Sequence, residues 1–223
     1  MRKWLAHLGV FLAVATVSLV LSSPSFADDD AAILQKAWSN YNIGHYKDAL
    51  NLLHPLAQNG NSTAQLLIGR CYENGLGVVQ NPEEAVKWYK LAAEQNDAQA
   101  QVFLAYCYEL GLGVAKDQKQ TVELMGKAAE AGNAEAQYNM ALYSSKGQYG
   151  VTKDYEVSFN WAMKSANQGY GQAELLVGAY YDAGIGVKQN QAKANEWFAK
   201  AKAKGFEREG NVFKTVKPWS KNN

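Results

Sequence analysis

The feature that most constrains the fold of this chain is a short glycine motif that recurs at nearly constant spacing. Four strings of the form Gly-x-Gly-Val, one of them with an extra residue, place their second glycines 36, 37 and 36 residues apart. These second glycines are Gly77, Gly113, Gly150 and Gly186. A fixed period of roughly 20–50 residues is typical of repeat architectures, in which one unit cannot bury its apolar face alone. The period therefore predicts a stack of similar units.

Other positions keep the same period, and each suits a pair of helices. Asn or Asp follows every motif and can accept hydrogen bonds from the free N–H groups of a helix's first turn. These helix starts are Asn81, Asp117, Asp154 and Asn190. A column of small residues precedes the motif and would let the second helix approach the first: Gly69, Ala105, Ala141 and Gly178. A tryptophan-rich column, expected to be mostly buried, would fill the space between helices: Trp88, Leu124, Trp161 and Trp197.

These signals predict ten helices in five pairs. We call the first helix of each pair the A helix and the second the B helix. The A helices are expected near residues 30–42, 62–74, 98–110, 134–146 and 171–183. The B helices are expected near residues 46–58, 82–95, 118–131, 155–168 and 191–204. The repeat region is thus 28–206, with units at about 30–62, 63–98, 99–134, 135–170 and 171–206, followed by a tail over 207–223.

The best-defined unit carries a family resemblance. Residues 64–93 read Ala-x-x-x-x-Gly-x-x-Tyr-x-x-Gly-Leu-Gly-Val, then Asn-x-x-x-Ala-x-x-Trp-Tyr-x-x-Ala-Ala. This pattern resembles the Sel1-like repeat, a relative of the tetratricopeptide repeat, and the resemblance covers four units over residues 63–206. It implies an all-α, right-handed α-solenoid. It also implies a non-enzymatic protein–protein interaction module, an adaptor or regulator that binds a protein or peptide on its concave face.

The N-terminus predicts export. Arg2 and Lys3 precede a long apolar stretch, and the small residues Ser25 and Ala27 suit a cleavage site, so residues 1–27 are expected to be a signal peptide. The mature protein is then expected to be a monomer without membrane insertion. We expect the periplasm of a Gram-negative envelope, from the look of the signal and the occurrence of relatives, with secretion as a host-interaction factor as the alternative.

Charge and motifs argue against several function classes. The net charge is +1, and removal of residues 1–27 would make it −1, so a partner held mainly by charge, such as nucleic acid, is not expected. His45 and His54 lack metal-ligand spacing, and the glycine motifs lack the lysine of a phosphate loop, so we expect no metal and no cofactor. An envelope hydrolase of the β-lactamase-like type, described for cysteine-rich relatives, is the rival function. No serine has the Ser-x-x-Lys spacing of such enzymes, and we expect no catalytic residue.

Cys71 and Cys107 occupy the same column of successive A helices. Adjacent helix axes lie about 8–10 Å apart, whereas a disulfide needs Cα atoms within roughly 7 Å. Bridges in the cysteine-rich relatives join two helices of one repeat, which differs from this arrangement. We favour buried free thiols over a bridge.

Tetratricopeptide-like stacks line their concave groove with the A helices, and the resemblance places the groove-facing residues three before and one after the small column. The predicted peptide-binding residues are Leu66, Arg70, Val102, Tyr106, Tyr138, Leu142 and Leu175. The alternative is that these side chains simply pack between adjacent A helices, as apolar residues at helical spacing often do.

Overall fold

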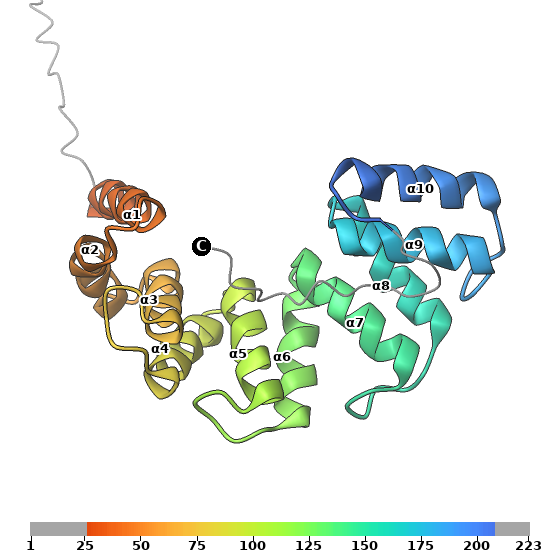
Figure 1. The fold of residues 1–223 in the computed structure, drawn as a ribbon. Helices are drawn as coiled ribbons and strands as arrows, with labels where there is room; N and C mark the ends of the chain where they lie inside the picture. Colours follow the sequence, from red (N-terminus) through yellow and green to blue (C-terminus); the bar gives the residue numbers. More distant parts are fainter. Residues whose placement is uncertain (1–25, 208–223) are drawn as a thin grey trace, which may run out of the picture.

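A computed structural model describes residues 26–207 of this chain, and the described residues form an all-α solenoid without strands. Ten helices follow one another along an open arch (Figure 1). The A helices are α1 (Phe26–Asn42), α3 (Ser62–Asn74), α5 (Ala98–Leu110), α7 (Ala134–Lys146) and α9 (Gly171–Ala183). The B helices are α2 (Tyr46–Gln58), α4 (Pro82–Glu94), α6 (Gln118–Glu130), α8 (Tyr155–Asn167) and α10 (Gln191–Ala203).

The helix boundaries agree with the sequence predictions to within one residue, except at the start of α1. We expected this helix from residue 30, and it begins at Phe26. Asp29 then falls in its first turn, where an acidic side chain stabilises the positive end of the helix dipole. The predicted signal peptide, apart from its last two residues, and the tail beyond Glu207 lie outside the described residues.

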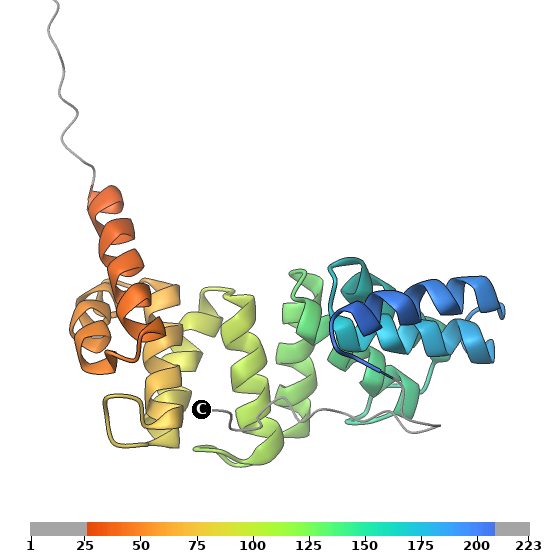
Figure 2. The same cartoon turned by 45° about the horizontal axis from the view of Figure 1, so that its top comes forward.

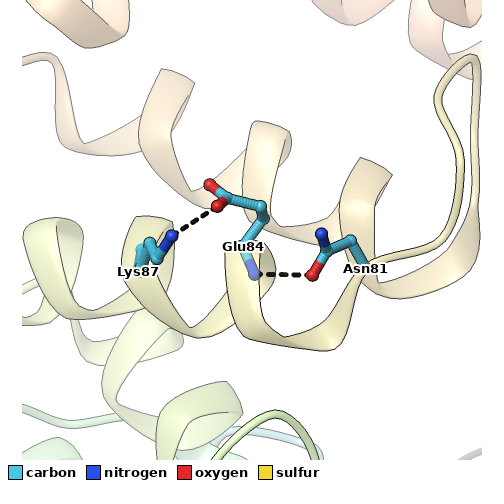
Figure 3. A network of polar contacts seen from close by, with 3 residues as sticks. All are labelled: Asn81, Glu84 and Lys87. Atoms are coloured by element: carbon cyan, nitrogen blue, oxygen red, sulfur yellow. Dashed lines mark hydrogen bonds and ion pairs between the residues drawn. The ribbon is translucent and has the colours of Figure 1, made fainter.

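The B helices begin as their Asn and Asp residues predict. Asn81 accepts a hydrogen bond from the backbone N–H of Glu84 at 3.1 Å, and the Glu84 side chain forms an ion pair with Lys87 (Figure 3). The same cap recurs at the start of the later B helices, at Asp117, Asp154 and Asn190. Every unit from the second onward therefore sets the start of its B helix with a side chain.

The column of small residues in the A helices does bring the two helices of a unit together. The side chain that packs against it comes from the B-helix residue one position after the tryptophan column. A Cβ atom added at Gly69 would lie 2.5 Å from Cε1 of Tyr89, and one added at Gly178 would lie 2.6 Å from the Phe198 ring. Tyr89 is completely buried and its ring stacks on Phe103 with centroids 5.4 Å apart. The contact inside each unit therefore uses this neighbouring column.

The tryptophans are mostly buried, as expected, but only Trp197 is fully so, because Trp88 and Trp161 keep part of their surface exposed. A one-residue step around a helix turns a side chain by about 100°, which moves Trp88 and Trp161 off the A–B contact. Lys164 and Lys200, one turn later, place their ammonium groups 4.0 and 3.8 Å from the ring centroids of Trp161 and Trp197. Part of the tryptophan column thus faces the edge of the core.

The glycine motifs join neighbouring units as well as turning the chain. The second glycine lies against the start of the preceding B helix: a Cβ at Gly113 would lie 2.2 Å from the carbonyl oxygen of Pro82, and one at Gly186 would lie 2.1 Å from that of Tyr155. Both glycines also have φ near +70°, which other residues rarely adopt. Gly150, in the motif with the extra residue, has nothing within 4 Å of its would-be Cβ. The insertion therefore coincides with the loss of this contact.

Packing follows the order of the chain. In the described region, the substantial helix contacts all join helices that are consecutive in the sequence. The axes of α9 and α10 run across the direction of α5 in both views, so the units rotate along the stack (Figure 2). None of the helices in residues 26–207 combines the length and the hydropathy needed to cross a bilayer.

Candidate protein-binding surface

The residues predicted to bind a peptide lie on α3, α5, α7 and α9, and they differ in exposure. Leu66, Arg70, Tyr106, Tyr138 and Leu142 are half-buried; we call these five residues the A-helix seam. Val102 and Leu175 are buried, with exposed fractions of 0% and 7%. All residues over 100–105 and 173–178 are buried, so these parts of α5 and α9 present no free face. The expectation that Val102 and Leu175 are open to a ligand is therefore wrong.

Arg70 connects three A helices. Its guanidinium carbon lies 5.7 Å from the ring centroid of Tyr41 in α1 and 5.5 Å from that of Phe103 in α5. Such positions over aromatic rings are favourable for a guanidinium group. Its Nε atom is buried and has no hydrogen-bond partner among the described residues. Arg70 therefore holds successive units together, as the packing alternative expected.

Tyr106 is fixed by two hydrogen bonds to the next A helix. Its hydroxyl donates to Oε1 of Glu135 at 2.8 Å and accepts from Nδ2 of Asn139 at 2.8 Å. Burial, and then the negative charge of Glu135, raises the pKa of Tyr106 well above its usual range. The hydroxyl therefore stays protonated, and the ring is held in one orientation between α5 and α7.

Aromatic and acidic side chains extend this arrangement. The rings of Tyr138 and Tyr170 lie 5.4 Å apart, and burial raises the pKa of Tyr138 to about 12. Glu109 accepts hydrogen bonds from the hydroxyls of Tyr149 at 2.7 Å and Tyr143 at 3.4 Å. The carboxylate of Glu109 is thus engaged by tyrosines of the fold, which leaves it less available to a partner.

A second interhelical row was missed by the sequence analysis. Buried glutamines of the A helices donate from Nε2 to a carbonyl oxygen near the end of the preceding B helix. These bonds are Gln65 to Ala57 at 3.0 Å, Gln101 to Ala93 at 3.4 Å and Gln137 to Ala129 at 3.1 Å. Glu174 is the fourth member of the column. The signal was available, because four long polar residues share the period of the glycine motif inside apolar helices.

In most units, the side-chain oxygen Oε1 of the buried glutamine or glutamate accepts a hydrogen bond from the residue that directly follows the B helix of the same unit. We call this residue's place in the repeat the clasp position. Gln95 donates to Oε1 of Gln65 at 2.8 Å, and Gln168 donates to Oε1 of Gln137 at 2.8 Å. In the last unit Lys204 takes this position and bonds to Glu174. In the unit over residues 99–134 the clasp position is Ala131, which has no side-chain donor. Oε1 of Gln101 is correspondingly without a partner among the described residues.

Groups with inherent reactivity do not gather on this surface. Cys71 and Cys107 are buried free thiols in separate clusters of the core, which confirms the preference for free cysteines. Burial raises the pKa of Cys71 to about 11 and that of Cys107 to about 12. Residues 26–207 contain no group of three His, Cys, Asp or Glu side chains placed to hold a metal ion.

Comparison with known sequences identifies the repeated unit. The sequence profile of the Sel1 repeat matches residues 62–97, 98–133, 134–170 and 171–206, which together cover more than half of the chain. This chain belongs to the Sel1-repeat family. Its four matched Sel1 repeats are the helix pairs from α3–α4 to α9–α10, and α1–α2 precede them.

Solved Sel1-repeat proteins share this fold. A Sel1-repeat protein from Oxalobacter formigenes has a TM-score of 0.72 and 33% identity, with 77% of this chain and 70% of that chain covered. A protective antigen with the same fold, c5321 from uropathogenic Escherichia coli, has a TM-score of 0.70 and 32% identity, with 79% of this chain and 38% of that chain covered.

A eukaryotic relative is similar over a small part of its own length. Chitin synthase regulatory factor 3 from Schizosaccharomyces pombe is 32% identical over 149 residues, which are 66% of this chain and 12% of that protein. The chain thus spans about an eighth of the length of this relative. Sel1 repeats form a protein-interaction fold, and the all-α solenoid of this chain has that fold.

Proposed function

We propose that this Sel1-repeat protein is an exported, non-enzymatic adaptor or regulator of the bacterial envelope, and that it binds a protein or peptide through the A-helix seam. The observation that carries the proposal is the fixed orientation of Tyr106, whose hydroxyl is hydrogen-bonded to Glu135 and Asn139 of the next repeat. Aromatic side chains held in place before binding lose little conformational freedom, so they make efficient anchors in an interface.

The chemistry of the seam favours a partner with apolar anchors. The carboxylate of Glu135 next to the seam already accepts a hydrogen bond from the Tyr106 hydroxyl, and the one guanidinium of the seam, on Arg70, lies between aromatic rings. An extended or helical peptide that offers apolar side chains therefore fits it better than a highly charged ligand. The regulatory role named for the Schizosaccharomyces pombe relative supports the same class of function, although the similarity covers only 12% of that protein.

A capture experiment tests the binding surface. The purified chain is immobilised and exposed to envelope extract from a Gram-negative host, beside a Tyr106→Ala/Leu142→Ser variant. The matched control is Glu84→Ala/Lys87→Ala, which removes a surface ion pair of α4 away from the seam. We expect one partner to be captured by the wild type and the control and to be lost by the seam variant. Retention by a seam variant with a native circular dichroism spectrum would place the binding site elsewhere.

Export is tested separately. We expect the protein expressed with its own N-terminus to appear in the periplasmic fraction with Asp28 as its first residue, because Ser25 and Ala27 suit signal peptidase. N-terminal sequencing of the fractionated protein measures this. Full-length protein in the cytoplasmic fraction would contradict export, and mature protein in the culture medium would favour secretion over residence in the envelope.

A further inference from the structure

The second repeat contains a cavity of about 380 Å³ between α4, α5 and α6. It is lined by polar and apolar side chains, of which six matter here: Lys90, Glu94, Gln101, Tyr108, Leu124 and Lys127. The cavity lies on different residues from the A-helix seam and belongs to no contact of the function proposed above. An inference drawn from it rests on the proposed function only in that it expects a peptide partner, and it is tested on other residues.

Gln101, one of the residues that line this cavity, has a buried acceptor atom without a partner in the described part of the chain. Gln101 is 3% exposed, and its Nε2 is used in the bond to the carbonyl oxygen of Ala93. The remaining polar atom, Oε1, is buried and has no hydrogen-bond partner within residues 26–207. A buried acceptor left unsatisfied is costly, so this oxygen favours any occupant of the cavity that brings an N–H or O–H group.

The other repeats of the same chain show which chemistry satisfies the equivalent atom. Oε1 of Gln65 and Oε1 of Gln137 each accept a hydrogen bond from the carboxamide of a glutamine at the clasp position. In the second repeat Ala131 stands at that position and brings no such group. At Gln101, therefore, the chain does not supply the carboxamide donor that the equivalent atoms of the neighbouring repeats receive.

The charged side chains around the cavity indicate the net charge of a ligand that would fit. Lys90 lies over the Tyr108 ring at 5.8 Å, and Lys127 forms an ion pair with Glu123 at 2.8 Å. These two ammonium groups are balanced by the carboxylates of Glu94 and Glu123, so the lining favours a neutral ligand. The ammonium groups can also donate hydrogen bonds to a ligand, and Oε1 of Gln101 can accept one. A carboxamide, which carries a donor and an acceptor side by side, meets both requirements.

We propose that this cavity binds the side-chain carboxamide of a glutamine residue from a peptide partner, which takes the place that Gln95 and Gln168 occupy in the neighbouring repeats. The amide N–H donates to Oε1 of Gln101, and the amide oxygen accepts from an ammonium group of Lys90 or Lys127. The methylene groups of the side chain lie against Leu124.

Three small probes test the chemistry in NMR titrations of the isotope-labelled protein. They are the N-acetyl, N-methylamide derivatives of glutamine, of glutamate and of methionine, which are similar in length and differ at the side-chain end. We expect the glutamine probe to shift the side-chain amide signal of Gln101 and the backbone signals of Leu104 and Tyr108. The glutamate and methionine probes have no N–H donor in their side chains, so their binding should be at least tenfold weaker, roughly the loss of one hydrogen bond. Equal responses to all three probes, or no response to the glutamine probe, would overturn the proposal.

A self-filling variant provides the second test. Ala131→Gln supplies the missing carboxamide from the chain itself, so we expect it to abolish the shifts caused by the glutamine probe. The matched control is Glu130→Gln, which adds a carboxamide at the neighbouring exposed position and should leave the shifts unchanged. Probe binding that persists unaltered in a folded Ala131→Gln protein would show that the clasp position does not border the site.

Discussion

Nζ of Lys204 lies 2.5 Å from Oε1 of Glu174, a carboxylate that is only 3% exposed, and the same ammonium group donates to the carbonyl oxygen of Gly169 at 2.8 Å. The last repeat thus replaces the glutamine pair of the earlier repeats with an ion pair. We expect Lys204→Ala to lower the free energy of unfolding by about 2 kcal/mol, because a buried charge loses its partner. Denaturant unfolding followed by circular dichroism measures the change.

The matched control for this pair is the double variant Glu174→Gln/Lys204→Gln. It recreates the contact between Gln65 and Gln95, so most of the lost stability should return. If the double variant is no more stable than Lys204→Ala, the clasp position does not act as a periodic contact.

Gly69 can be replaced by alanine only at the expense of packing, because the new Cβ would lie 2.5 Å from the buried Tyr89 ring. We expect Gly69→Ala to destabilise the fold by about 1–3 kcal/mol through overpacking. Gly126 in α6 is the matched control, since nothing lies within 4 Å of its would-be Cβ. Gly126→Ala should be neutral or stabilise by about 0.5–1 kcal/mol through helix propensity. Similar midpoints of thermal unfolding for the two variants would contradict the contact with Tyr89.

The two thiols should be unreactive in the folded protein. Cys71 and Cys107 are buried, and a thiol rather than a thiolate is a poor nucleophile. We expect a disulfide-exchange reagent at pH 8 to detect no thiol in the native protein and two in denaturant. Rapid labelling without denaturant would show that the A helices open locally, and an intact mass two hydrogens short would reveal a bridge.

The same thiols should make stability depend on alkaline pH. Burial raises the pKa of Cys71 from 9.0 to about 11 and the pKa of Cys107 from 9.0 to about 12. The unfolded chain therefore releases these protons first, so the free energy of unfolding is unaffected below pH 9 and falls as the pH rises from 9 towards 11–12.

The buried tyrosines add the same trend from about pH 10 upward, as Tyr138 does with its raised pKa. A Cys71→Ala/Cys107→Ala variant should lose the slope between pH 9 and pH 10 and keep only the tyrosine contribution above it. Denaturant titrations at fixed pH measure both. A variant whose slope between pH 9 and pH 10 equals that of the wild type would contradict the thiol contribution.

The fold was predictable because its signals repeat. One weak helix cap, such as Asn81, says little, but the same residue type at the same period four times fixes both the helix boundaries and the order of the units. The contact inside the unit was harder to assign. Trp88 and Tyr89 are adjacent, and both could fill the space next to Gly69; only the rotation of α4 about its axis decides between them, and the sequence does not contain that angle.

The surface was less predictable than the fold. Arg70 and Val102 belong to the same predicted row, yet Arg70 is half-buried between aromatic rings and Val102 is inside the core. The difference arises from packing between units, which depends on side chains 30 or more residues apart. The Gln101 cavity was equally hidden, although its cause, the change from glutamine to Ala131 in one column, is visible in the sequence once the clasp position is known.

The order of contacts along the chain has a mechanical consequence. Helices pack mainly on those before and after them in the sequence, so a force that pulls the two ends apart acts on the junctions between units in series. The junctions should then give way one at a time, because no single central sheet or core holds the whole chain. The chain should lengthen in steps of about one unit, and each released pair of helices can find its place again without rearrangement of the others. A stack built in this way is extensible, and its resistance is set by its weakest junction.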